Sequence, residues 1–228
     1  MAPIWASWAP GRADPSGAIP THRKSVMKLY YSPGACSLSP HIALREAGVK
    51  FDLVKTALQT HTLADGSDYY EITAKGQVPL LELDDGARLS EGPVILQYIA
   101  DHAPASGLAP AAGTMERYRV MEWLNFVTSE LHKGFSPMFN PKLDKAAKEV
   151  FAARLRDRYA YVDAKLEGCD YLLGKQFSVA DAYLFTVTNW AAGVGVDLAG
   201  FKNLEAYMAR MKSRPAVQDA MKAEGLIK

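Results

Sequence analysis

Residues 104–113, PASGLAPAAG, separate two stretches of the chain that differ in their hydrophobic pattern. Before this segment, short apolar runs typical of strands alternate with helical patterns and turn sequences. After it, almost all apolar residues recur at the three- and four-residue spacing of helices. Since a run of proline, glycine and alanine favours a linker, the sequence predicts an α+β domain at residues 27–103, a linker at 104–113 and an all-α domain at 114–228.

The first domain is predicted to follow the order strand, helix, strand, helix, strand, strand, helix (βαβαββα). The expected strands cover residues 28–31, 51–54, 78–83 and 88–89. The first expected helix follows the first strand and ends near residue 46, and the other two cover 67–72 and 92–101. Asp84-Asp85-Gly86 predicts a hairpin turn between the last two strands. The initial strand, helix and strand suit a parallel pair of strands joined by a crossover.

The second domain is predicted to be a helical bundle, because it shows helical spacing without an internal repeat. Its helices are expected to begin at Thr114, near Asp144, at Ser178, near Asn203 and at Pro215. Ser178 and Asp181 have the spacing of a capping box, so we interpret this pair as structural.

The composition of the 228 residues excludes several classes of protein. The net charge of +1 gives no reason to expect a nucleic-acid or membrane partner. No apolar run approaches the roughly 18 residues that a membrane helix needs. The two cysteines, Cys36 and Cys169, lie far apart in the sequence, which predicts neither a disulfide framework nor a metal site. A reducing compartment, the cytoplasm, is therefore expected.

Residues 1–26 differ from the rest of the chain, because they are rich in proline and show no sustained hydrophobic period. We expect a disordered extension here, with Met27 as the functional first residue. A cleaved signal peptide is a weaker alternative, since prolines and Arg12 interrupt any apolar core.

The adjacent residues Cys36 and Ser37 form the first candidate site. They follow the loop Ser32-Pro33-Gly34-Ala35 at the start of a predicted helix. Ser37 can cap this helix, which would place the Cys36 sulfur near free N–H groups and the positive end of the helix dipole. Both effects favour a thiolate. The alternative is a buried cysteine that serves only packing.

The second candidate site comprises Val78-Pro79 and Glu91-Gly92. A proline at the entry of a strand predicts either a cis bond, which would free the Val78 backbone to pair with a peptide, or an edge strand that tolerates proline. Glu91 precedes a helix, where it can either bind an ammonium group or simply favour the helix dipole. Gly92 permits a close approach of a ligand to the backbone.

The third candidate is His132-Lys133, near the end of the first helix of the second domain. This pair is either functional or an ordinary basic helix terminus.

Three segments together resemble the bacterial beta class of the glutathione transferases. They are MKLYYSPGACSLSPHIALREAG (27–48), GQVPLLELDDGARLSEGP (76–93) and LLGKQFSVADAYLF (172–185). The resemblance implies the glutathione transferase fold, a thioredoxin-like N-terminal domain followed by an all-α domain. It also implies glutathione as co-substrate, no metal, and a homodimer.

The resemblance assigns roles to single residues. Cys36, Ser37 and His132 are expected to be catalytic. The residues expected to bind glutathione are Tyr31, Cys36, Gln77, Val78, Pro79, Glu91, Gly92, Lys133, Asn125, Ser129 and Glu130. The Val78 backbone would pair with the cysteinyl part of glutathione, and Glu91 would hold the γ-glutamyl ammonium. Gly92 stands where the family often has serine, so backbone N–H groups would contact the γ-glutamyl carboxylate.

The predicted function is conjugation of reduced glutathione to small hydrophobic electrophiles, a detoxification reaction. Aromatic and apolar residues of the second domain are expected to line the electrophile pocket: Phe126, Phe135, Met138, Phe139 and Trp190. One alternative is glutathione-dependent thiol–disulfide exchange, peroxide reduction or reductive dehalogenation through Cys36. Another is a binding protein without turnover on the same fold.

Overall fold

The structure, a computed structural model, describes residues 26–228. The predicted disordered extension therefore lies, except for Val26, outside the described residues. In the described part, five strands form one sheet in the order β3-β2-β1-β4-β5. They are β1 (Met27–Tyr31), β2 (Phe51–Ala57), β3 (Thr62–Leu63), β4 (Leu80–Glu82) and β5 (Arg88–Ser90). β1 pairs with β2 in parallel, as predicted, and the other neighbours are antiparallel.

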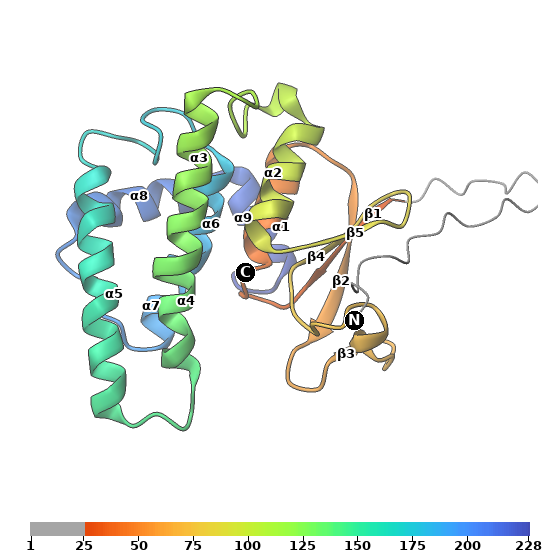
Figure 1. Cartoon of the computed structure of the whole chain (residues 1–228), viewed down its shortest axis with the longest axis horizontal. Helices are drawn as coiled ribbons and strands as arrows, with labels where there is room; N and C mark the ends of the chain where they lie inside the picture. The colour runs from red at the N-terminus through yellow and green to blue at the C-terminus, as the bar shows by residue number, and fades with distance from the viewer. Residues whose placement is uncertain (1–25) are drawn as a thin grey trace, which may run out of the picture.

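Helices α1 (Leu38–Glu46) and α2 (Gly92–His102) lie together between the sheet and the helical part of the chain (Figure 1). The first seven residues of α1 are buried, because this helix contacts α2 as well as helices from the end of the chain. This arrangement confirms the predicted thioredoxin-like first part. The predicted helix at 67–72 is wrong in extent, since only a 3₁₀ turn forms there (Tyr69–Glu71).

The second part is helical, as predicted. Its α-helices are α3 (Met115–Phe126), α4 (Lys133–Phe135), α5 (Lys145–Lys165), α6 (Val179–Thr188), α7 (Trp190–Gly193), α8 (Lys202–Ser213) and α9 (Pro215–Ala223). Thr114 and Asp144 cap α3 and α5, with side-chain oxygens that accept backbone N–H groups at 3.2 and 2.8 Å. Between α3 and α4 the chain forms a π-helical turn, Val127–His132, rather than the continuous α-helix that the spacing predicts.

Helix α6 forms the centre of the core, and all ten of its residues are buried. The predicted capping box is confirmed. The Asp181 carboxylate accepts the N–H and the hydroxyl of Ser178, both at 2.9 Å, and also the N–H of Leu172 at 2.9 Å. Burial raises the pKa of Asp181 to about 6, and the three hydrogen bonds oppose this shift.

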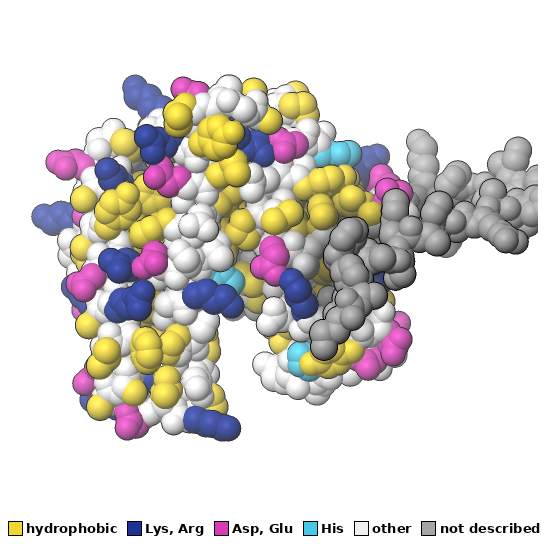
Figure 2. Space-filling view, viewed as in Figure 1, with side chains coloured by type: hydrophobic (Ala, Val, Ile, Leu, Met, Phe, Trp, Pro, Cys, Tyr) yellow, Lys and Arg dark blue, Asp and Glu magenta, His cyan; other side chains and the backbone are white. Residues whose placement is uncertain are grey.

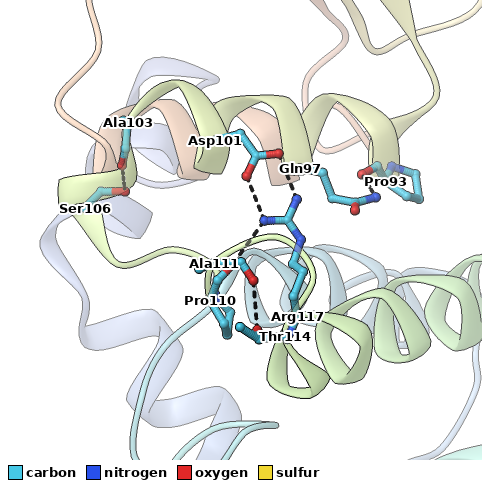
Figure 3. Close-up of polar contacts among 9 residues, drawn as sticks. All are labelled: Pro93, Gln97, Asp101, Ala103, Ser106, Pro110, Ala111, Thr114 and Arg117. Carbon is cyan, nitrogen blue, oxygen red and sulfur yellow. Dashed lines mark hydrogen bonds and ion pairs between the residues drawn. The ribbon is translucent and has the colours of Figure 1, made fainter.

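The predicted linker is fastened to the helical part of the molecule, and an ion pair beside it joins that part to α2 (Figure 3). The buried Arg117 guanidinium of α3 donates to both carboxylate oxygens of Asp101 in α2, at 2.7 and 2.9 Å, and to the Pro110 carbonyl at 3.3 Å. The Leu108 carbonyl accepts the N–H of Val179 at 2.9 Å. These contacts join the linker to α3 and α6, while the residue boundaries of the two domains remain a prediction.

Within residues 26–228 we find no helix that is both long and apolar enough to cross a membrane.

Replacement of Asp181 by alanine should lower the free energy of unfolding by about 3 kcal/mol, because it leaves buried donors of Ser178 and Leu172 unpaired and removes a helix cap. Since burial raises the Asp181 pKa, the folded state binds this proton more tightly than the unfolded state. The loss should therefore be larger at about pH 5 than at about pH 8. Urea unfolding at both pH values measures it, with the exposed Asp157→Ala in α5 as control. An equal, small loss in both variants would contradict the structural role.

Candidate functional site

A cleft of about 290 Å³ opens between the sheet part and the helical part of the molecule. Figure 2 shows this face hollowed where the two parts meet, with acidic and basic side chains around the hollow. The predicted site residues that line the cleft are Cys36, Gln77, Val78, Pro79, Glu91, Gly92, His132 and Lys133. The structure therefore brings together residues from four separate segments of the sequence.

Cys36 lies in the loop between β1 and α1, and its thiol donates to the Val78 carbonyl at 3.2 Å. Burial raises the pKa of Cys36 to about 11, and the N–H groups of Cys36 and Ser37 only partly oppose this effect. The expectation of a helix-stabilised thiolate is therefore wrong for the cysteine itself. Desolvation outweighs the helix terminus, so Cys36 is an S–H donor at neutral pH.

The peptide bond between Val78 and Pro79 is cis, which confirms the first of the two predicted alternatives. The edge-strand alternative is wrong, because β4 lies between β1 and β5. Gly76 anchors the segment before this bond. Its φ is +58°, and a Cβ atom there would lie 2.6 Å from the Tyr70 ring. The Gln77 carbonyl accepts the Tyr69 hydroxyl at 3.0 Å, which further fixes the approach to Val78.

Glu91 lies at the start of α2 with a φ of +72° and makes no side-chain capping bond to the helix. Its carboxylate instead accepts a hydrogen bond from the Lys75 ammonium at 2.6 Å. The hydrogen bond from Lys75 lowers the pKa of Glu91, with a smaller opposing effect of burial. The sequence did not single out Lys75, although it begins the same segment, Lys75-Gly76-Gln77, that leads to the cis bond.

His132 ends the π-helical turn and lines the cleft. Its Nδ1 lies 2.6 Å from the hydroxyl oxygen of Tyr183, a cleft residue from α6 that sequence reasoning missed. Burial, together with the nearby Lys133 ammonium, lowers the pKa of His132 to about 4, so the ring is neutral at pH 7. The Trp190 ring packs edge-on against His132 at 4.9 Å.

The π-helical turn has a local cause in the sequence. The hydroxyl groups of Thr128 and Ser129 donate to the carbonyls of Leu124 and Asn125 at 2.7 and 3.1 Å. Such bonds compete with the backbone ladder and loosen a helix. The wider turn brings both Thr128 and His132 to the wall of the cleft, consistent with the frequent occurrence of π-helical segments at functional sites.

Three of the other predicted residues do not line the cleft and contact other parts of the molecule. Ser37 is buried; its hydroxyl donates to the Ser32 carbonyl at 3.3 Å and accepts the Ser32 N–H at 3.2 Å, so it closes the loop instead of capping α1. Tyr31 is buried against the ring of His41. Glu130 forms an ion pair with Arg158 of α5 at 2.8 Å.

Asn125 and Ser129 also lie outside the cleft. Asn125 borders a shallow depression that shares Glu91 with the cleft, and the exposed Ser129 bonds its own helix. The predicted apolar wall does not line the cleft either. Its members Phe126, Phe135, Met138, Phe139 and Trp190 are buried or pack against other aromatic rings. The sequence showed their apolar character but not which side of each helix faces the cleft.

The loop before Cys36 is held from the far end of the chain. The N–H of Gly34 donates to the buried Glu224 carboxylate at 2.9 Å, and the other Glu224 oxygen lies 2.8 Å from Nδ1 of His41. The Trp190 indole N–H donates to the Gly34 carbonyl at 2.8 Å. No sequence pattern links these residues, since Gly34 and Glu224 are 190 positions apart.

Comparison with known proteins agrees with this geometry. Residues 25–101 match the family model "Glutathione S-transferase, N-terminal domain", and residues 126–215 match "Glutathione S-transferase, C-terminal domain". The glutathione S-transferase GstA of Escherichia coli is 47% identical over 200 residues, covering 88% of this chain and all of that protein. The chain belongs to the glutathione S-transferase family.

Solved structures show the same relationship. The bacterial transferase BphK, solved as a ternary complex, is 54% identical, with a TM-score of 0.85 and coverage of 87% of this chain and 99% of that chain. A sphingomonad glutathione S-transferase, solved with glutathione, is 48% identical, with a TM-score of 0.84 and coverage of 88% and 100%.

Alkylation of Cys36 by iodoacetamide, in protein without added glutathione, should be slow at neutral pH and should rise as the pH approaches about 11. At about pH 8 the rate should be roughly a hundredfold below that of a free thiol, because only the thiolate reacts. Mass spectrometry of the modified peptide gives the rate, and Cys36→Ala isolates the signal of Cys169. A rate that is already maximal at pH 7 would contradict the raised pKa.

Proposed function

We propose that this protein conjugates reduced glutathione to small hydrophobic electrophiles. One observation carries the proposal: a single cleft combines the Cys36 thiol, the backbone of Val78 before a cis proline, and the Glu91 carboxylate. These groups match the three parts of glutathione, namely a thiol, an extended peptide and an α-amino acid. The relatives named as glutathione S-transferases, and the sphingomonad structure with glutathione, support the assignment.

The backbone of Val78 would pair with the cysteinyl amide of glutathione, as a strand edge pairs with an extended peptide. At the γ-glutamyl end, Glu91 would accept the ammonium, while Lys75 and the N–H groups at the start of α2 would attract the carboxylate. The helix N-terminus and the two lysines, Lys75 and Lys133, provide positive potential for an anionic peptide.

Rate enhancement requires that the glutathione thiol ionises near neutral pH. Cys36 is protonated at that pH and can donate its S–H to the glutathione sulfur, and the Lys133 ammonium adds favourable charge. Hydrogen bonds and positive charge that favour the anion lower the pKa of the bound thiol. The thiolate then attacks the electrophile, and the leaving group departs with its electron pair. Cys36 assists this step and forms no bond to the electrophile.

Glutathione-dependent redox chemistry is the second candidate, and the position of the Cys36 sulfur in the cleft favours it. In this reaction the small fraction of Cys36 that is ionised attacks a disulfide, forms a mixed disulfide and releases the other thiolate. The free thiols of Cys36 and Cys169 suit a reducing compartment, so we place the protein in the cytoplasm with a role in detoxification.

Replacement of Cys36 by alanine separates the two candidates. The Cys36→Ala variant should conjugate glutathione to an activated aryl chloride with kcat/KM reduced by about tenfold or less, the loss expected for one neutral hydrogen bond. Wild-type protein incubated with oxidised glutathione should gain one glutathione by intact mass, and the variant none. Absence of conjugation by the wild-type protein would contradict the main proposal. Conjugation that is slow in both proteins, with rapid disulfide exchange only in the wild type, would favour redox chemistry.

We also propose a homodimer formed through α3 and α2. Four large apolar side chains are exposed on these helices: Met115, Tyr118 and Met121 on α3 and Val94 on α2. The three on α3 are spaced three residues apart and therefore share one side of the helix. Figure 2 shows hydrophobic side chains over these two helices. An apolar face of this kind suits the same face of a second copy, and the shallow depression containing Asn125 adjoins it.

Replacement of Met121 by lysine should weaken the dimer by at least about 30-fold, since an unpaired charge would be buried in the apolar contact. Analytical ultracentrifugation across a concentration series measures the dissociation constant. Val150→Lys is the matched control, because Val150 is an exposed apolar residue of α5 outside the face. A monomeric wild-type protein, or equal dissociation constants for both variants, would contradict the proposed interface.

A further inference from the structure

The hydroxyl group of Tyr183 contacts His132 inside the wall of the cleft, with 2.6 Å between the hydroxyl oxygen and Nδ1. Tyr183 belongs to the buried helix α6 and is only 2% exposed, and its ring packs edge-on against the imidazole. Both residues line the cleft that holds Cys36. The contact therefore joins the buried centre of the bundle to His132, the only histidine among the described residues that line the cleft.

Both partners are neutral near pH 7. Burial lowers the pKa of His132 to about 4 and raises the pKa of Tyr183 above its ordinary value. A neutral imidazole carries one hydrogen, on either Nδ1 or Nε2, and the hydrogen bond made by one nitrogen determines the state of the other. A phenol is a stronger acid than a neutral imidazole N–H, and an unprotonated ring nitrogen is a better acceptor than a phenol oxygen. Thr128 is a second hydrogen-bond partner of the Tyr183 hydroxyl, but an unprotonated ring nitrogen is also a better acceptor than an alcohol oxygen. The favoured arrangement therefore has the Tyr183 hydroxyl donating to Nδ1.

We propose that Tyr183 is a positioning residue that holds His132 in the tautomer with its hydrogen on Nε2. The inference rests on the proposed function, because the acceptor for Nε2–H is the sulfur of glutathione bound in the cleft. With Nδ1 occupied by Tyr183, Nε2 is the ring nitrogen that remains for a ligand. His132 then acts as a hydrogen-bond donor to the thiolate.

Neighbouring residues hold the side chains of Tyr183 and His132 in place. The capping box of Ser178 and Asp181 fixes the start of α6, and this fixes the backbone position from which the Tyr183 side chain extends. The Trp190 ring also packs edge-on against His132, and its indole N–H donates to the Gly34 carbonyl two residues before Cys36. Two aromatic side chains, Tyr183 and Trp190, therefore contact the ring of His132. The hydrogen bond from Trp190 to Gly34 links them to the loop that carries Cys36.

The tautomer matters because the two forms present opposite groups to the cleft. With hydrogen on Nε2, the ring donates to a sulfur anion and stabilises it. With hydrogen on Nδ1, the ring presents a lone pair to the same anion, which is unfavourable. Loss of a residue that selects the tautomer should therefore reduce turnover more than it weakens glutathione binding, as expected for a group that acts on developing charge.

The direct test is the tautomer of His132 in wild-type protein, read from a long-range proton–nitrogen correlation spectrum of isotope-labelled protein. His132→Asn identifies the signals by their disappearance. We expect hydrogen on Nε2 in the wild type, and a mixture of both tautomers in Tyr183→Phe. Tyr159→Phe is the matched control, because it removes another buried hydroxyl, bonded to Thr188 at 3.2 Å, from the same bundle. This control should leave the His132 signals unchanged.

Kinetics of conjugation add a second readout. We expect Tyr183→Phe to lower kcat by about tenfold, with KM for glutathione within about twofold. In the His132→Asn background the same substitution should have no additional effect, because Tyr183 acts through His132.

Hydrogen on Nδ1 in the wild type, or an unchanged tautomer in a folded Tyr183→Phe protein, would overturn the proposal. So would an equal kcat loss in the presence and absence of His132. The spectrum of the wild type, assigned with His132→Asn, needs no substrate and does not depend on whether Tyr183→Phe folds. It therefore decides the tautomer even if the protein does not catalyse conjugation, and failure of the two proposals remains distinguishable.

Discussion

Both backbone groups of Gly34 are bonded to side chains of the helical part of the chain, and the cleft depends on these two hydrogen bonds. Its N–H donates to Glu224 and its carbonyl accepts the indole N–H of Trp190. Gly34 has a φ of +71°, a conformation that suits glycine. Because Cys36 follows two residues later, its sulfur is placed by the helical part as much as by the sheet. The two parts of the molecule therefore form one site.

The interior of the cleft is neutral, and its charges lie on the rim. Burial holds Cys36 as a thiol and His132 as an uncharged imidazole, because desolvation penalises the charged form of each group. The charged Lys75, Glu91 and Lys133 lie where the cleft opens to water. This division suits a zwitterionic peptide whose charged ends bind at the rim while its thiol enters a region of lower polarity. The interior then acts on the thiol through hydrogen bonds rather than through charges. In the proposed arrangement, Tyr183 decides whether His132 donates a hydrogen bond to the thiolate.

Prediction from the sequence succeeded where the cause is local and failed where a side chain finds a distant partner. The proline at the entry of a predicted strand left a cis bond and an edge strand as alternatives, and the cis bond is the one that forms. The capping box at Ser178 follows from a three-residue spacing. The predicted helix cap of Ser37 was wrong because its hydroxyl bonds Ser32 across the loop, and capping preferences do not include such a partner. The pKa of Cys36 was wrong in direction because the sequence shows the helix terminus but not the extent of burial.

The sequence by itself determined the main strands and helices, the division into a mixed and a helical part, and the family, but not β3 or the π-helical turn. These depend on hydrophobic periodicity, turn residues and short motifs, all of which act over a few residues. Only the tertiary structure decided which groups meet at the cleft. Lys75 with Glu91, Tyr183 with His132, and Glu224 with Gly34 are pairs separated by 16, 51 and 190 positions. Glu224 meets Gly34 because α9 packs against α1, and Tyr183 meets His132 because α6 packs against the π-helical turn. No local pattern in the sequence records that packing.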